Sequence, residues 1–281
     1  MNMHAFSSID FNLDYTLDCG QVFRWEKEDE WWTGVVNRKV VRASQDIEDG
    51  KVLIDSKLPK SFFYDYFRMD DDLSAILKAA DKDAHTSEAI SKYWGLRLIR
   101  QEPWECIISY MLATASSIPT IKTRISNICR TFGEEIEEGY YSFPDAEALA
   151  GACTTDLSDC KLGFRTKRIQ KAAIMVADGE LHIEEIFELD YHGAKKKLME
   201  VEGIGEKVAD CILLFAFGKM ESFPVDTHIK QIVEWYYADD PYFEGKMNNH
   251  KIGEWGRQYF GKYCGYAQEY LFYQKRLEGL K

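Results

Sequence analysis

The strongest constraint on the fold is a change in the spacing of apolar residues near residue 61. Before this point, short segments rich in β-branched and aromatic residues are separated by Asn37-Arg38 and Asp49-Gly50, pairs typical of tight turns. After it, the aromatic residues of 62–67 and many later apolar residues recur at the spacing of one helix face. Strands followed by many helices indicate an α+β fold, with an N-terminal antiparallel sheet joined to a mostly helical domain.

The expected elements define two domains, residues 1–95 around the sheet with its flanking helices and residues 96–281 around the later helices. Strands are predicted at 22–27, 31–36, 40–44 and 52–55. Helices are predicted at 73–80, 104–115, 121–132, 165–177, 193–199, 207–217, 227–236 and 266–277. Gly133 and Gly218 stand just past two of these helices, so we expect both to adopt the left-handed conformation that commonly ends a helix.

The seven cysteines argue against metal and disulfide chemistry, because they are scattered and never form a Cys-x-x-Cys pair. A four-cysteine iron–sulfur cluster also favours closer spacings, so we expect neither a cluster nor a bound metal. Residues 1–10 lack the basic and apolar regions of a signal peptide, and no apolar run approaches about 18 residues. We therefore expect a soluble intracellular protein, cytoplasmic in a prokaryote, with no membrane partner.

The net charge of −12 argues against a nucleic-acid partner, because cationic contacts to phosphate dominate such binding. The acidic residues, however, are grouped in short runs such as 26–30 and 134–138, and a basic stretch lies between Lys161 and Lys171. A local positive surface can bind DNA even when the whole chain is acidic. A basic run of this kind is more often only a solvated helix face.

The segment 198–229 carries the most informative pattern. Gly203-Ile204-Gly205 separates an apolar helix that ends near Val201 from a second helix that begins near Glu206. Two glycines around one apolar residue permit positive φ and the close approach of another backbone. A phosphate can then bind the free N–H groups at the start of the second helix. Taken alone, the same pattern is also typical of a structural turn.

Two candidate catalytic residues flank this second helix. Lys207 lies in its first turn, where the helix dipole and apolar neighbours both favour a neutral, nucleophilic amine. Asp226 follows Pro224-Val225 at the position of a helix N-cap, from which its carboxylate can also face a lysine or a developing positive charge. Cys211 lies four residues after Lys207 and shares its helix face. A snorkelling surface lysine, a simple cap and a core cysteine remain open alternatives.

These residues resemble the helix–hairpin–helix superfamily of DNA glycosylases. More narrowly, GIGEKVADC at 203–211 followed by PVDTH at 224–228 is similar to 8-oxoguanine DNA glycosylases. Four further segments resemble that family in the same order, namely CGQVFRW, RQEPWECIISY, KLGFRTKRI and GYAQEYLF, at 19–25, 100–110, 161–169 and 265–272. The resemblance covers nearly the whole chain, and it implies that 96–281 forms the catalytic domain.

The resemblance implies a bifunctional DNA-repair glycosylase and lyase that flips 8-oxoguanine out of duplex DNA. Lys207 would attack the sugar C1′ and form a Schiff base, whose β-elimination nicks the strand, while Asp226 would stabilise the cationic transition state. Gly20 would accept a hydrogen bond from N7–H of the base, and Gln268 would contact its Watson–Crick edge. Phe272 and Cys211 would sandwich the plane of the base.

The resemblance also implies contacts to DNA outside the base pocket. Phe164 would wedge into the base stack, and Arg165 would contact the base opposite the lesion. His228 would bind phosphate, as would the backbone N–H groups of Gly203, Gly205 and Lys207. We expect a monomer with no cofactor; the family also allows a monovalent or calcium ion on the backbone carbonyls of the hairpin.

The chain departs from the eukaryotic members of the family at one place. Those members carry a run of asparagines and an arginine that contacts the cytosine opposite the lesion. Here the corresponding stretch is 115–120, Ala-Ser-Ser-Ile-Pro-Thr. Short hydroxyl side chains make no bidentate contact of the arginine kind, so we expect a relaxed preference for the opposite base.

Three alternatives follow from the same residues. Glycosylases for alkylated bases typically work with the aspartate alone, so Lys207 disfavours them. Thymine-glycol and adenine-mismatch enzymes usually carry a four-cysteine cluster near the C-terminus, where this chain has Cys264 alone. A noncatalytic DNA-binding module would use the hairpin only for phosphate, and it would leave Lys207, Asp226, Gly20 and Gln268 as coincidences.

Overall fold

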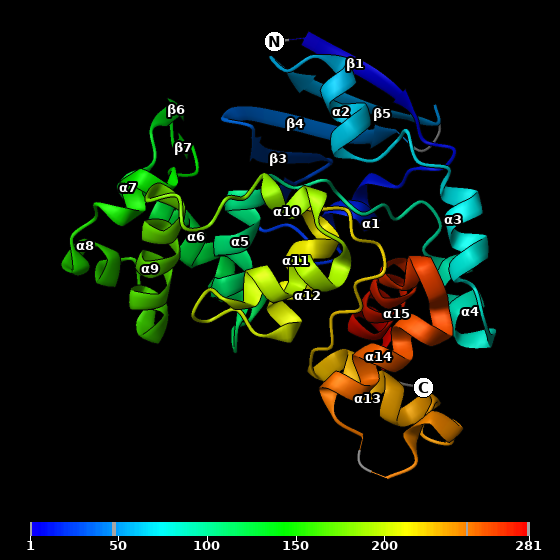
Figure 1. Ribbon diagram of the computed structural model, residues 1–281. Helices are drawn as coiled ribbons and strands as arrows, with labels where there is room; N and C mark the ends of the chain where they lie inside the picture. The colour runs from blue at the N-terminus through cyan, green and yellow to red at the C-terminus, as the bar shows by residue number, and fades with distance from the viewer. Residues whose placement is uncertain (1, 47–48, 246, 280–281) are drawn as a thin grey trace.

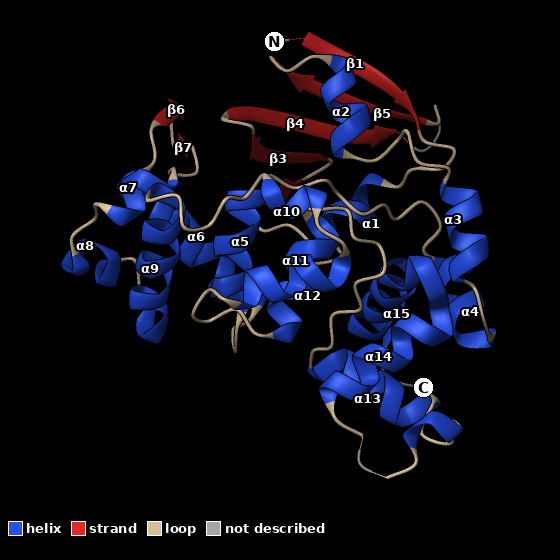
Figure 2. Ribbon diagram, in the orientation of Figure 1, coloured by secondary structure: helices blue, strands red, loops and turns tan. Residues whose placement is uncertain are grey.

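The computed structural model describes residues 2–46, 49–245 and 247–279, and it confirms the α+β architecture. An antiparallel sheet lies at one end of the molecule, and the helices form the rest (Figure 1; Figure 2). The strands of the sheet are β1 Asn2–Ser7, β2 Trp25–Glu28, β3 Trp31–Val36, β4 Lys39–Asp46 and β5 Lys51–Ser56.

The sheet has the order β1-β5-β4-β3-β2, so the predicted antiparallel meander from β2 to β5 is confirmed. Asn37 and Arg38 both have positive φ, 45° and 56°, as a two-residue hairpin turn between β3 and β4 requires. The predicted strand at 22–27 starts three residues too early, because β2 begins at Trp25. The sequence analysis missed β1, which pairs with β5 and sets Phe6 opposite Val52.

The helices follow the sheet, with α1 inserted between β1 and β2. They are α1 Leu13–Asp18, α2 Lys60–Tyr66, α3 Leu73–Ala80, α4 Ala84–Lys92, α5 Pro103–Ala113, α6 Ile118–Phe132, α7 Ala146–Ala150, α8 Thr154–Asp159, α9 Thr166–Ala177, α10 Glu185–Glu188, α11 Tyr191–Met199, α12 Glu206–Phe215, α13 Thr227–Tyr236, α14 Asn249–Phe260 and α15 Cys264–Glu278. The remaining elements are short 3-10 turns at Gly163–Arg165, Pro241–Phe243 and Gly261–Tyr263, and a small hairpin of β6 Glu135–Glu137 and β7 Tyr140–Tyr141.

Each predicted helix corresponds to an observed one, and the predictions for α3 and α13 match at both ends. The helices that were not predicted from the sequence are α1, α4, α7, α8, α10 and α14. Gly218 has the expected positive φ of 66°, but the prediction for Gly133 is wrong, because its φ is −86°. Gly133 is instead required for close packing: a Cβ there would lie 2.1 Å from the Ser142 carbonyl oxygen.

Two apolar cores hold the chain together. The smaller core joins the sheet to α2, where Phe63 and Phe67 are fully buried. The larger core runs through the helical region, where α12 packs on α5 and α11 while α15 packs on α3, α4, α13 and α14. Because α12 and α15 each contact several other helices, they are central to the packing of the helical region. Across 2–46, 49–245 and 247–279, no helix is both long and apolar enough to span a bilayer.

Candidate active site

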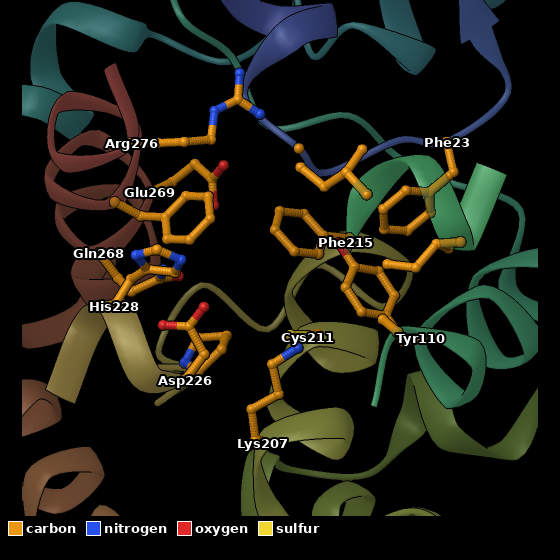
Figure 3. Close-up of a pocket in the computed structure, with 16 residues that line it drawn as sticks. Phe23, Tyr110, Lys207, Cys211, Phe215, Asp226, His228, Gln268, Glu269 and Arg276 are labelled. Atoms are coloured by element: carbon orange, nitrogen blue, oxygen red, sulfur yellow. The ribbon is translucent and has the colours of Figure 1, made fainter. Parts of the chain in front are cut away.

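A cavity of about 180 Å³ opens between α12, α15 and the residues that follow α1. This volume is several times the roughly 30 Å³ that one water molecule occupies in the liquid. Figure 3 shows its side chains converging from opposite walls. The lining residues are Gly20, Phe23, Tyr110, Ala113, Ile118, Ile121, Lys207, Cys211, Phe215, Pro224, Asp226, His228, Gln268, Glu269, Phe272 and Arg276. The cavity thus collects residues from distant parts of the sequence.

Lys207 reaches this cavity from the first turn of α12. The helix begins after a hairpin in which Gly203 has a φ of 102°, a conformation that favours glycine. Gly205 is the N-cap residue, and as a glycine it has no side chain to accept a hydrogen bond from the first-turn N–H groups. Lys207 is half-buried, and its Nζ lies 5.6 Å from the centre of the Tyr110 ring. The hairpin therefore leaves N–H donors free while directing an amine into the cavity.

Asp226 faces the same cavity from the start of α13. Its side chain accepts a hydrogen bond of 2.8 Å from the Ile229 backbone N–H, so the predicted N-cap is confirmed. The same carboxylate lines the cavity wall across from Lys207 (Figure 3). The cap fixes the carboxylate in place, because its geometry is set by the backbone of the helix. Both interpretations of Asp226, cap and cavity group, are therefore compatible.

Cys211 and Phe272 supply apolar walls of the cavity. Cys211 lies one turn after Lys207 on α12, and both residues line the cavity as the shared helix face predicted. Burial raises the pKa of the Cys211 thiol to about 12. Phe272 on α15 is half-buried, and its ring meets the His228 ring edge to face, with centroids 5.6 Å apart. The walls thus present flat or soft surfaces suited to a planar ligand.

Gly20 and Gln268 provide polar groups at the cavity. Gln268 is only 5% exposed, and its Oε1 is buried without a hydrogen-bond partner in the described chain. Such an acceptor is costly unless a ligand donates to it. Gly20 has a φ of 103°, and a Cβ there would lie 3.4 Å from Arg276 Nη1 and 3.7 Å from Phe272 Cε1. A side chain at position 20 would therefore crowd the wall next to Phe272.

Family models match the chain over most of its length. Residues 3–107 match the N-terminal domain of 8-oxoguanine DNA glycosylases, and residues 108–257 match the HhH-GPD superfamily of base excision DNA repair proteins. The chain belongs to this family of base excision DNA glycosylases. It is a DNA-repair enzyme, a DNA glycosylase with lyase activity.

Relatives of known name agree with this assignment. A probable N-glycosylase/DNA lyase of Methanothermobacter thermautotrophicus is 30% identical over 71% of this chain and 69% of its own. The apo 8-oxoguanine glycosylase/lyase of Clostridium acetobutylicum is 31% identical, with a TM-score of 0.90 over 97% of this chain and 96% of that one. A structure of that enzyme with DNA containing cytosine opposite 8-oxoG has a TM-score of 0.89 at 30% identity, over 100% and 99% of the two chains.

Of the residues predicted to contact DNA outside the base pocket, His228 lines this cavity, whereas Phe164, Arg165, Gly203 and Gly205 lie outside it. Phe164 is 60% exposed, and the guanidinium of Arg165 stacks 4.1 Å from its ring centre. Arg165 itself is buried, and it donates hydrogen bonds to the Thr114 carbonyl and to Ser116 Oγ. Ala115 between them has a positive φ of 48°. Arg165 therefore stabilises the 114–116 loop, a role that was not predicted from the sequence.

Several residues of the glycosylase's cavity were not predicted from the sequence. Tyr110 and Phe215 stack with ring centroids 5.5 Å apart and form an apolar wall. Glu269 is only 4% exposed, and burial raises the pKa of its carboxyl group to about 7. Glu269 and Phe272 are three residues apart on α15, a spacing that places both on one helix face. That spacing is the signal by which Glu269 could have been found.

Metal-ligand clusters give no further candidate site in the part of the chain that the structure describes. There, no group of three or more histidine, cysteine, aspartate and glutamate side chains is arranged to hold a metal ion.

Proposed function

We propose that this enzyme excises 8-oxoguanine from duplex DNA and then cleaves the strand, acting as a monomer. One observation supports the proposal above all: a single cavity contains every residue to which the family resemblance gives a catalytic or base-binding role. These residues are Gly20, Lys207, Cys211, Asp226, Gln268 and Phe272. A base can reach such a cavity only when it is flipped out of the duplex.

Lys207 and Asp226 carry the proposed chemistry. The neutral amine of Lys207 attacks C1′ while the bond from C1′ to the base breaks, and the base leaves with the bonding electron pair. The aminated sugar opens to a Schiff base, and loss of a C2′ proton then expels the 3′ phosphate. Asp226 stabilises the positive charge that develops on the sugar, and its cap on α13 keeps the carboxylate in position.

Gln268 and Gly20 determine which base fits. The unpaired Gln268 Oε1 accepts a hydrogen bond from the Watson–Crick edge of the base, which is rich in donors in a guanine derivative. The Gly20 carbonyl accepts from N7–H, a donor present in 8-oxoguanine and absent in guanine. Guanine would leave that carbonyl facing a lone pair, so one contact can discriminate strongly. Phe272 and Cys211 cover the faces of the base.

Free backbone donors and nearby side chains position the DNA. The N–H groups of Gly203, Gly205 and Lys207 point to a phosphate at the start of α12, and a Cβ on Gly205 would meet no atom within 4 Å, which leaves room for it. His228, exposed beside Phe272, binds a second phosphate oxygen. Phe164 is exposed and wedges into the base stack.

The base opposite the lesion lies near the 114–116 loop and Arg165 in this proposal. Arg165 contacts that base only after it exchanges a hydrogen bond to the loop for one to DNA, because the loop already engages its guanidinium. Ser116, Ser117 and Thr120 offer short hydroxyls, so we propose a relaxed preference for cytosine. Excision assays against all four opposite bases test this point, and a strict cytosine requirement would contradict it.

Borohydride trapping tests the proposal as a whole. A duplex with one 8-oxoguanine should give a covalent adduct with the wild-type chain, and Lys207→Gln should give none while it still binds DNA. Lys197→Gln is a matched control, because Lys197 lies on α11 and pairs with the exposed Glu200 away from the cavity. Intact DNA binding with no adduct in the wild type would instead favour a noncatalytic binding module.

A further inference from the structure

Glu269 is an acidic residue that lines the cavity, and the proposed mechanism gives it no role. It lies on α15 between Gln268 and Phe272 in sequence, lines the cavity and is only 4% exposed. A carboxylate in such surroundings is unfavourable unless a cation neutralises it. Arg276, a cation on the same helix, forms its ion pair with Asp18 instead.

The contacts of Glu269 place its carboxyl group on the Gly20 side of the cavity. Cys19, the buried residue that precedes Gly20, lies close enough to this carboxyl group for each of the two to shift the pKa of the other. Gln268 precedes Glu269 on the helix, so the two side chains point in different directions. The Oε1 of Gln268 is buried without a hydrogen-bond partner in the described chain. If Gln268 contacts the Watson–Crick edge of a base, then Glu269 lies toward the edge that Gly20 contacts.

The surroundings of Glu269 favour its neutral acid form. Burial is the main cause that raises the pKa of its carboxyl group to about 7, and Asp226 raises it further, whereas Cys19, Arg276 and Lys207 lower it. A base that fills the cavity removes the remaining water and disfavours the charged form more strongly. The titratable or charged groups that face Glu269 from the packed elements are Asp18, Cys19, Tyr110, Lys207, Cys211, Asp226, His228 and Arg276.

8-Oxoguanine differs from guanine on one edge, which carries both N7–H and the C8 carbonyl oxygen. The Gly20 carbonyl can accept from N7–H but cannot satisfy an oxygen, so a buried C8 oxygen needs a donor. A neutral carboxylic acid supplies that donor, and an ionised carboxylate would repel the oxygen. We propose that Glu269, as a neutral acid, donates a hydrogen bond to the C8 oxygen of 8-oxoguanine and is a specificity-determining residue. This inference rests on the proposed function.

The test compares wild type, Glu269→Gln and Glu269→Ala between pH 6 and pH 9. Two reactions are measured under single-turnover conditions with the enzyme below saturation, so that the rates report kcat/KM: excision of 8-oxoguanine from a duplex, and cleavage of a duplex that already contains an abasic site. The second reaction uses the same lysine and aspartate but no base. Glu234→Gln, an exposed glutamate of α13, is the matched control.

Glu269→Gln keeps a hydrogen-bond donor in its amide group, but this side chain does not titrate. For excision, the ratio of wild-type to Glu269→Gln kcat/KM should therefore fall by about tenfold from pH 6 to pH 8, since kcat/KM reports groups of the free enzyme. Glu269→Ala should excise at least about tenfold more slowly than Glu269→Gln at every pH, while all variants cleave the abasic site alike.

Two results would overturn the role of Glu269: a wild-type to Glu269→Gln ratio that is independent of pH, or equal excision by the alanine and glutamine variants. A loss of abasic-site cleavage that parallels the loss of excision would also contradict it, because it would show a general structural role. A wild-type enzyme that cleaves abasic sites without excising 8-oxoguanine would instead contradict the proposed substrate. The two failures are thus distinguishable.

Discussion

His228 and Phe272 meet edge to face, with ring centroids 5.6 Å apart and ring planes at 86°. The contact joins the first turn of α13 to the C-terminal half of α15 at the cavity. A residue proposed to bind phosphate therefore supports a residue proposed to stack on the base. In the proposed function, this pair of rings would couple the placement of the DNA backbone to the placement of the base.

Phe272→Ala should lower kcat/KM for excision of 8-oxoguanine by about 10- to 100-fold. The reason is the loss of stacking, which contributes about 1–3 kcal/mol per base, and each 1.4 kcal/mol is about tenfold in rate. Single-turnover assays measure the effect, and Phe272→Tyr is the control that keeps an aromatic ring. Equal rates for the alanine variant and the wild type would exclude stacking by Phe272.

Asp226→Asn and Asp226→Ala should separate the cap from the chemistry. Asparagine also caps helices well, so Asp226→Asn should keep the free energy of unfolding near the wild-type value while it loses most excision. Asp226→Ala should lose excision and also about 0.5–2 kcal/mol of stability. Urea unfolding and trapping assays check the two effects. An active Asp226→Asn variant would show that the carboxylate charge has no part in catalysis.

Gly20→Ala should destabilise the protein by about 1–2 kcal/mol, because the φ of 103° at Gly20 is unfavourable for a residue with a Cβ. It should also reduce excision, since the new methyl group lies 3.4 Å from Ile118 Cδ1 and 3.7 Å from Phe272 Cε1 in the cavity wall. Gly151→Ala is a suitable control, because Gly151 has a φ of −78°. Thermal unfolding and excision assays on both variants provide the measurement.

The buried Glu269 should make stability depend on pH. Its pKa is raised from 4.5 to about 7 in the folded state, so its contribution is fully present below pH 4.5 and is lost as pH rises through 7. This difference corresponds to about 3 kcal/mol. Relative to Glu269→Gln, the wild type should thus lose up to about 3 kcal/mol of unfolding free energy between pH 4.5 and pH 8. Parallel curves for the two proteins would refute a buried, titrating Glu269.

Arg165→Ala should destabilise the 114–116 loop, because it removes hydrogen bonds from a buried guanidinium to the Thr114 carbonyl and to Ser116 Oγ. We expect a loss of about 2 kcal/mol, the usual range for hydrogen bonds to charged groups. Arg168→Ala is the matched control, since the Arg168 side chain is 40% exposed on the same segment. In denaturant unfolding, Arg165→Ala should have a clearly lower free energy of unfolding than Arg168→Ala.

Local patterns predicted most of the fold. The helical spacing of apolar residues located α3 and α13 to the residue, and the turn pair Asn37-Arg38 located the hairpin between β3 and β4. The strand β1 was missed because it is defined by pairing with β5, a contact between segments far apart in sequence. Gly133 was assigned the wrong conformation because its requirement comes from Ser142, which a local pattern does not include.

The site was predicted unevenly for a similar reason. Lys207 was found from its place in the first turn of a helix after the glycine hairpin, and Gln268 was found only through the family resemblance; both line the cavity. Glu269 was missed because a charged residue normally lies on the solvated face of a helix, and only tertiary packing buries it. Arg165 was placed against DNA by its motif, yet its partners are backbone groups about fifty residues earlier, which no sequence pattern indicates.

Cys211 gives the pocket wall a chemical property that suits its surroundings. Oxidants such as peroxide react with a thiolate, and a pKa of about 12 keeps this thiol protonated at neutral pH. Of the seven cysteines only Cys153 is exposed, so an oxidant meets that thiol first, away from the cavity. Under the proposed function, the conditions that generate the substrate should therefore oxidise Cys153 before Cys211 and leave the wall of the pocket reduced.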